Sequence, residues 1–195
     1  MSDVPTVLVV TGPSGAGKGT LIRQLVARVP AIEATVSATT RTRRPREEDG
    51  REYWFLTDED FSQRVAAGEF LEWVEYVSGH RYGTLRSELD RIAANGRVPL
   101  LELETEGALR VKDKVAGAVT IFISARVDEL ERRLRERATE STGEIGERIE
   151  LARRQLEQAD EFDHVISNDD LDRAVGELTQ LVSGLVTPAA TMPGR

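Results

Sequence analysis

Residues 7–26 read Val-Leu-Val-Val-Thr-Gly-Pro-Ser-Gly-Ala-Gly-Lys-Gly-Thr-Leu-Ile-Arg-Gln-Leu-Val. An apolar run, a glycine-rich segment and a second apolar stretch predict a strand, a tight turn and a helix. Glycines let the backbone approach a polyphosphate closely, and N–H groups at a helix start point toward the anion. The stretch therefore predicts a phosphate-binding loop made of Gly12, Pro13, Ser14, Gly15, Ala16, Gly17, Lys18, Gly19 and Thr20, in which the Lys18 charge serves the terminal phosphates.

The position after the lysine departs from the usual loop pattern. Many phosphate-binding loops carry a Ser or Thr there as a magnesium ligand, whereas this chain has Gly19 and places the hydroxyl at Thr20. We expect Thr20 to contact magnesium directly or through water. The sequence Gly-Lys-Gly-Thr resembles the loop of small nucleoside monophosphate kinases.

Composition excludes several classes of protein. The 195 residues carry a formal net charge of −8 and contain no cysteine. A disulfide framework and a cysteine metal site are thereby excluded, and the negative charge argues against broad nucleic-acid binding. No apolar run is long enough to span a membrane, and the N-terminus does not resemble a signal peptide. We expect a cytoplasmic protein that binds neither membrane nor nucleic acid.

The remaining pattern alternates short apolar strands with amphipathic helices. We expect strands at 33–37, 98–104, 119–123 and 164–166, and helices at 17–28, 87–95, 127–137, 149–158 and 171–185. A further helix starts at Thr57 or Asp58 and ends at Gly68, inside an aromatic-rich α+β unit. Residues 138–146 are expected to form a loop. The order predicts an α/β fold, a mainly parallel sheet flanked by helices, with ligand at the carboxyl ends of the strands.

Five separate segments resemble the guanylate kinase family, which phosphorylates GMP. These are Ser37-Ala38-Thr39-Thr40-Arg41-Thr42-Arg43-Arg44 with Tyr53, Glu69-Phe70-Leu71-Glu72-Trp73, Tyr82-Gly83-Thr84, the arginine-rich helix over 126–137, and Ser167-Asn168-Asp169-Asp170. The resemblance covers residues 5–185 and implies a P-loop nucleoside monophosphate kinase fold. It further implies a single domain over 1–195, with a core at about 1–36, 98–124 and 160–187, a GMP-binding insertion at about 37–97, a helical lid at about 125–159 and a frayed tail at 188–195.

The resemblance assigns a GMP site to this insertion. Two arginines and a tyrosine hydroxyl suit a phosphate dianion, and a carboxylate suits the N1–H and N2 amino donors of guanine. Adenine would instead place a lone pair against that carboxylate. The residues that match these family positions are Ser37, Arg41, Arg44, Tyr53, Glu72, Tyr82, Thr84 and Glu104.

The resemblance also assigns residues to ATP and to phosphoryl transfer. Fixed positive charge near the moving phosphoryl group is the main requirement of this chemistry. Matching positions make Lys18, Arg41, Arg133, Arg137 and Arg148 the expected catalytic residues, and Asn168 lies where the family approaches the adenine. Glu102 and Glu104 replace the family's two aspartates at a strand end, and Glu102 with Thr20 is expected to hold Mg²⁺, directly or through water.

The expected activity is therefore transfer of the ATP γ-phosphoryl group to GMP, giving ADP and GDP, a step in purine nucleotide metabolism. Two alternatives remain open on the sequence alone. One is another nucleoside monophosphate kinase, such as a kinase for CMP, which Glu72 and the segment 37–44 disfavour. The other is a non-catalytic guanylate-kinase-like binding module, which Lys18 disfavours. We expect a monomer or a homodimer, between which the sequence does not decide.

Overall fold

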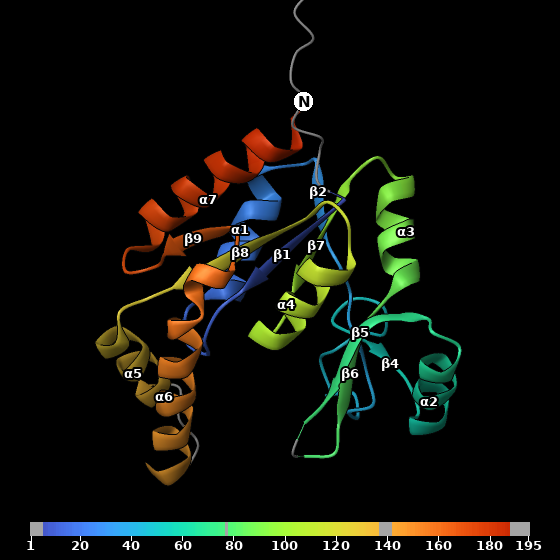
Figure 1. Ribbon diagram of the computed structural model, residues 1–195. Helices are drawn as coiled ribbons and strands as arrows, with labels where there is room; N and C mark the ends of the chain where they lie inside the picture. Colours follow the sequence, from blue (N-terminus) through green and yellow to red (C-terminus); the bar gives the residue numbers. More distant parts are fainter. Residues whose placement is uncertain (1–5, 77, 137–141, 188–195) are drawn as a thin grey trace, which may run out of the picture.

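The computed structural model describes residues 6–76, 78–136 and 142–187. Its centre is a sheet of five parallel strands in the order β2-β7-β1-β8-β9 (Figure 1). All five residues of β1 are buried, because a central parallel strand is covered on both faces. The strands are β1 (Val7–Thr11), β2 (Ile32–Ala34), β7 (Val98–Glu102), β8 (Ala118–Ser124) and β9 (His164–Ser167).

Helices cover both faces of this sheet. Helices α1 (Lys18–Arg28) and α7 (Leu171–Val186) pack together over the face to which β1 contributes Leu8 and Val10. Helix α4 (Thr105–Lys114) packs over the opposite face, against Val7 and Val9. The prediction of a mainly parallel α/β sheet between helices is confirmed.

A second, smaller sheet lies to one side of the first. Its four strands run in the order β4-β3-β6-β5, and β3 pairs parallel with β4 but antiparallel with β6. Stacked Phe61 and Phe70, with ring centroids 4.3 Å apart, fill the core beneath α2. The elements are β3 (Ala38–Thr39), β4 (Trp54–Phe55), α2 (Asp58–Ala66), β5 (Phe70–Glu75), β6 (Arg81–Leu85) and α3 (Arg86–Ala94).

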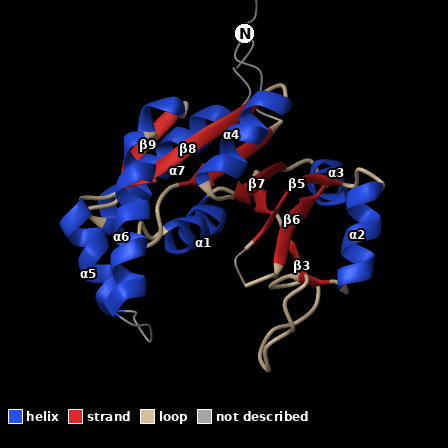
Figure 2. Cartoon of the chain, turned by 60° about the horizontal axis from the view of Figure 1, so that its bottom comes forward, coloured by secondary structure: helices blue, strands red, loops and turns tan. Residues whose placement is uncertain are grey.

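On the other side of the core lie α5 (Val127–Glu136) and α6 (Thr142–Glu157), followed by the 3₁₀ turn η1 (Ala159–Glu161). Figures 1 and 2 both place α5 and α6 opposite the second sheet, with the carboxyl end of the parallel sheet between them. The loop predicted over 138–146 is wrong from Thr142 onward, because α6 begins there. Residues 137–141, which include Arg137, lie outside the described residues, as does the tail over 188–195.

Other boundaries differ by a few residues, and one helix was not predicted. Strand β2 ends at Ala34 and not at residue 37, and β7 ends at Glu102 and not at residue 104. Helix α2 begins as predicted, since the Thr57 hydroxyl accepts the Asp60 N–H. Helix α4 carries Gly107 in its first turn and no side-chain cap, so its sequence lacks the usual start signal. No helix among the described residues is both long and apolar enough to cross a membrane.

Candidate active site

The glycine-rich segment joins β1 to α1 at the carboxyl end of the central strand. Gly17, directly before the first helical residue, has φ +86°, a conformation that side chains rarely adopt. A Cβ on Gly12 would lie 2.2 Å from the Ile123 carbonyl oxygen on β8. Gly12 thus lets the chain turn against a neighbouring strand, and Gly17 lets α1 begin with its N–H groups toward the loop. This is the geometry predicted for a phosphate-binding loop.

Lys18 points back across the loop that carries it. Its ammonium donates to the Gly12 carbonyl at 2.6 Å and to the Pro13 carbonyl at 3.2 Å. Burial lowers the Lys18 pKa, while the Glu104 and Glu102 carboxylates oppose that shift. The charge is therefore held at the mouth of the loop, where an anion could replace the two carbonyls.

Three of the predicted ATP-side residues converge on the same loop. Asn168 donates from Nδ2 to the Ala16 carbonyl at 2.7 Å. Arg133 donates to the Asn168 carbonyl at 3.0 Å and to that of Gly15 at 3.4 Å. Arg148, on α6, donates to the Ser14 hydroxyl at 3.0 Å. The loop backbone is therefore braced by residues more than 100 positions away in the sequence.

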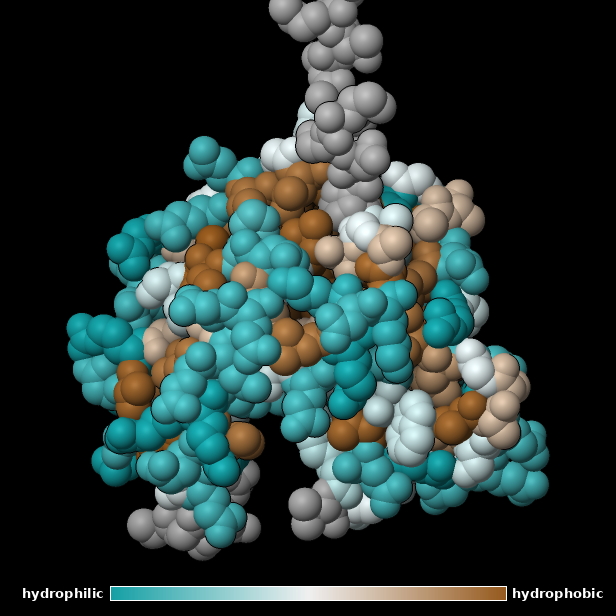
Figure 3. Space-filling view, in the orientation of Figure 1, coloured by the Kyte–Doolittle hydropathy of each residue, from teal (hydrophilic) through white to brown (hydrophobic). Residues whose placement is uncertain are grey.

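A large cavity of about 1320 Å³ opens beside this loop. Figure 3 shows the corresponding notch between the two halves of the molecule, bordered mostly by hydrophilic residues. The cavity is bounded by the phosphate loop, the second sheet, the start of α4 and helix α6. Of the predicted site residues, those lining it are Ser14, Lys18, Ser37, Tyr53, Glu72, Tyr82, Glu102, Glu104 and Arg148.

Glu72 lies in the wall formed by the second sheet, directly opposite Thr84 in the β5–β6 ladder. Its Oε1 accepts two hydrogen bonds from Thr84, at 3.1 Å from the N–H and 2.9 Å from the hydroxyl. Burial raises the Glu72 pKa, and the two Thr84 bonds and the Arg110 charge oppose the shift. Thr84 itself is only 1% exposed and does not line the cavity. In this state Thr84 orients the carboxylate and Ser37 is the hydroxyl that faces the cavity.

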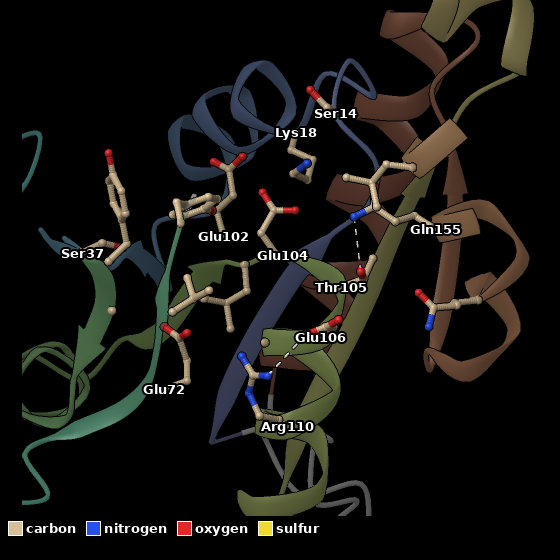
Figure 4. Close-up of a pocket in the computed structure, with 18 of the residues that line it drawn as sticks. Ser14, Lys18, Ser37, Glu72, Glu102, Glu104, Thr105, Glu106, Arg110 and Gln155 are labelled. Atoms are coloured by element: carbon tan, nitrogen blue, oxygen red, sulfur yellow. Dashed lines mark hydrogen bonds and ion pairs between the residues drawn. The ribbon is translucent and has the colours of Figure 1, made fainter. Parts of the chain in front are cut away.

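Glu102 and Glu104 stand at the end of β7, on the same side of the cavity as Lys18 (Figure 4). Glu102 is exposed to the cavity, yet the surrounding protein excludes enough water to raise its pKa, against the Lys18 charge. Its Oε2 lies 3.9 Å from where a Cβ on Gly19 would be, so a side chain at Gly19 would contact it. Glu104 precedes α4 without capping it through its side chain, and its carboxylate is left to the cavity.

Only some of the residues predicted to bind the GMP phosphate lie together in the cavity. The Tyr53 and Tyr82 rings pack edge to face, 5.8 Å apart, and both line the cavity. The Arg41 guanidinium lies 5.3 Å from the Tyr53 ring centroid but pairs with Glu47, and neither Arg41 nor Arg44 lines the cavity. Glu47 also accepts the Arg44 backbone N–H at 2.8 Å.

The cavity contains further polar residues that the sequence patterns did not single out. Gln155 on α6 donates to the Thr105 hydroxyl at 3.4 Å, which links α6 to the start of α4. Arg110 and Tyr76 also line the wall near Glu72. Arg110 belongs to the unpredicted helix α4. A signal that could have indicated this helix is the helical spacing of Ala108, Val111 and Val115.

Known proteins match this chain over nearly its whole length. The guanylate kinase family profile matches residues 4–185. A guanylate kinase of Symbiobacterium thermophilum is 43% identical over 177 residues, covering 90% of this chain and 83% of that protein. One from Synechococcus sp. strain CC9311 is 47% identical over 175 residues, covering 89% and 90%.

A solved structure gives the same result. The crystal structure of guanylate kinase from Anaplasma phagocytophilum matches with a TM-score of 0.74 and 26% identity, covering 96% of this chain and 89% of that one. This chain belongs to the guanylate kinase family.

Proposed function

We propose that this protein transfers the γ-phosphoryl group of ATP to GMP and releases ADP and GDP. One observation carries the proposal: a phosphate loop with a partly buried lysine and a buried carboxylate held by Thr84 border the same cavity. The family assignment supports the same reaction. A GMP phosphate oxygen attacks the γ-phosphorus, the bond to the β–γ bridging oxygen breaks, and ADP leaves with that electron pair.

The phosphate loop is the ATP end of the proposed site. Its amides and Lys18 hold the phosphates, and Asn168 and Arg133 position the loop from behind. Arg148 reaches Ser14 from α6 and would place positive charge beside the transferring group. Arg137 is assigned the same role by the family resemblance alone.

A magnesium ion fits the donor set beside Lys18. Mg²⁺ takes one or two protein oxygens and completes its shell with phosphate oxygens and water. Glu102 supplies a carboxylate beside Gly19. The Thr20 hydroxyl accepts from Arg23 at 3.3 Å and does not line the cavity, so it would reach the ion through water or after releasing Arg23. When bound, the ion would neutralise charge on the β- and γ-phosphates.

Glu72 and Glu104 are the guanine end of the proposed site. Ionised carboxylates accept from guanine N1–H and N2, whereas adenine offers an acceptor at N1, so GMP is preferred over AMP. Ser37 faces the cavity and can donate to guanine O6. Arg41, Arg44, Tyr53 and Tyr82 bind the GMP phosphate, which requires Arg41 to exchange Glu47 for that phosphate.

The cavity is too open to exclude water, so the proposal includes closure. We assign residues 37–97 to a GMP-binding unit and 125–159 to a lid, which approach each other over the bound substrates. Closure prevents hydrolysis of ATP and brings Arg148 toward the GMP unit.

A coupled assay of ADP formation with GMP, AMP, CMP and UMP tests this function. Efficient turnover with GMP and at least about 10³-fold lower kcat/KM with the others is expected. Preference for CMP would favour the alternative monophosphate kinase. Binding of GMP without turnover under any condition would favour the non-catalytic module.

A further inference from the structure

The two oxygens of the Glu72 carboxylate have different surroundings. Oε1 accepts both hydrogen bonds from Thr84, which fixes the plane of the carboxylate. Oε2 faces helix α4, where a Cβ on Gly107 would lie 3.6 Å from it. Only Oε1 is used by the second sheet, so Oε2 is directed toward α4 and the cavity.

Arg110 reaches the same place from the next turn of α4. Its Nη2 lies 3.9 Å from the position that a Cβ on Gly107 would occupy. The Arg110 guanidinium and the Glu72 Oε2 are therefore both within 4 Å of one position beside Gly107. The other side of the guanidinium faces Glu106, with Nη1 and Oε2 3.7 Å apart. That distance is too long for a hydrogen bond. Figure 4 shows the Arg110 guanidinium between Glu72 and Glu106.

The charge of Arg110 opposes the effect of burial on Glu72. Glu72 is only 9% exposed, and burial favours its neutral form. The groups around it are the neutral Thr84 from β6, the Tyr76 phenol after β5 and Arg110 from α4. The Glu104 carboxylate after β7 lines the same cavity and also acts on Tyr76. Arg110 is the only cation among these described neighbours of Glu72, and its charge favours the carboxylate.

The protonation state of Glu72 decides which purine it complements. A carboxylate offers two acceptors, which match the N1–H and N2 amino donors of guanine. A carboxylic acid offers one donor and one acceptor; in the same pose the donor matches adenine N1, whereas the acceptor faces C2–H, because the amino group of adenine lies at C6. A neutral Glu72 would therefore lose one of the two bonds to guanine and would no longer place a lone pair against adenine N1, so the preference for guanine would narrow without any change in the shape of the site.

We propose that Arg110 is a positioning residue for base selection, which keeps Glu72 ionised and thereby preserves the preference for GMP over AMP. Arg110 acts through Glu72 and contacts no substrate. The inference rests on the proposed function, because it concerns the base that the kinase accepts. It extends that function by making selectivity dependent on a residue of α4 and on pH.

The test compares wild type with Arg110→Gln, Arg110→Lys and Arg173→Gln. Arg173 on α7 is a matched control, because it forms a similar exposed i,i+4 contact with Glu177 at 3.8 Å. We expect Arg110→Gln to lower kcat/KM for GMP by about three- to tenfold at pH 5.5 and by less than about twofold at pH 8. AMP turnover should not fall in parallel, so the GMP/AMP ratio decreases at low pH. Arg110→Lys and the Arg173→Gln control should both behave like wild type. Ionisation of the GMP phosphate changes with pH in the same way for every variant, so comparison with the control removes its effect.

Two further measurements separate this inference from the proposed function. Side-chain carboxyl ¹³C NMR of the GMP-free protein, with Glu72 assigned from Glu72→Gln, should show its titration moved to higher pH in Arg110→Gln. In the Glu72→Gln background, Arg110→Gln should have no added effect on GMP.

Equal losses at both pH values, failure of the lysine variant to rescue, or additive losses in the double variant would each overturn the role of Arg110. Absence of GMP phosphorylation by wild type at pH 8 would instead overturn the proposed function. In that case the NMR titration would still show whether Arg110 affects the ionisation of Glu72.

Discussion

Arg41 and Glu47 form a two-pronged ion pair: Arg41 Nη1 and Nη2 donate to the two Glu47 carboxylate oxygens at 3.1 and 2.8 Å. Glu47 also accepts the Arg44 N–H, so one carboxylate engages both arginines assigned to the GMP phosphate. The Arg41 guanidinium lowers the Glu47 pKa, and the pair is ionised at neutral pH. A carboxylate thus stands where a phosphate dianion is expected to bind.

The first prediction concerns this competition. Glu47→Gln keeps an acceptor for Arg44 but removes the charge that competes for Arg41, so the KM for GMP should fall by about two- to fivefold. Glu47→Ala should raise KM instead, because the 41–47 turn loses its hydrogen bonds. Steady-state kinetics at two salt concentrations measures both. A higher KM in both variants would show that Glu47 only supports the loop.

The second prediction is that Lys18 serves the reaction and not the fold. Burial lowers its pKa, so the folded state gains nothing from its charge. Lys18→Met should therefore melt no lower than wild type and lose at least about 10³-fold in kcat. Lys114→Met, an exposed lysine at the end of α4, is the matched control. Turnover near the wild-type value in Lys18→Met contradicts the assignment.

The third prediction links Glu72 to stability. Burial raises its folded-state pKa above the unfolded value, so ionisation of Glu72 opposes folding. Wild type and Glu72→Gln should be equally stable below the unfolded pKa of a glutamate. As pH rises through the folded pKa, wild type should become less stable than the variant, by on the order of 1 kcal/mol.

Urea titrations at pH 4 and pH 8 measure this difference, and GMP binding by calorimetry should be lost in the same variant. A Glu72→Gln protein that is less stable at pH 8 would show that the Thr84 bonds outweigh the buried charge.

The fourth prediction concerns Glu104, which precedes α4 and does not cap it. Aspartate is a far better N-cap than glutamate, so Glu104→Asp should turn the carboxylate toward the α4 N–H groups. The variant should melt at a higher temperature and bind GMP about tenfold more weakly. Calorimetric titration with GMP decides this, and binding equal to or tighter than that of wild type would contradict it.

Much of the fold was predictable because its signals are local. The apolar run before Gly12, the glycine loop and the Thr57 cap each depend on adjacent residues. Helix α4 was missed although Ala108, Val111 and Val115 recur at helical spacing and pack in one cluster, because a glycine lies in its first turn and no side-chain cap marks its start. Sequence patterns favour short-range features and underestimate elements that depend on tertiary contacts.

The residues of the candidate site also differ in how far the sequence could predict them. The loop motif pointed to Lys18, and family positions pointed to Glu72 and Asn168, but the pairing of Arg41 with Glu47 depends on how the 41–47 turn folds. Likewise, Thr84 was expected to face the base, whereas its hydroxyl is directed at Glu72. These are choices between partners of similar strength, which residue type alone does not determine.

Gly12 has a consequence for how this family can change over time. Because a Cβ there would collide with the backbone of β8, its constraint belongs to the sheet and persists whether or not nucleotide is bound. Lys18 has no such steric constraint, and in the proposed function its ammonium serves the reaction. In a lineage that gave up catalysis for binding, Lys18 would be free to drift while Gly12 would be retained. Lys18 would therefore distinguish a catalytic member of the family from a non-catalytic binding module, whereas Gly12 would be present in both.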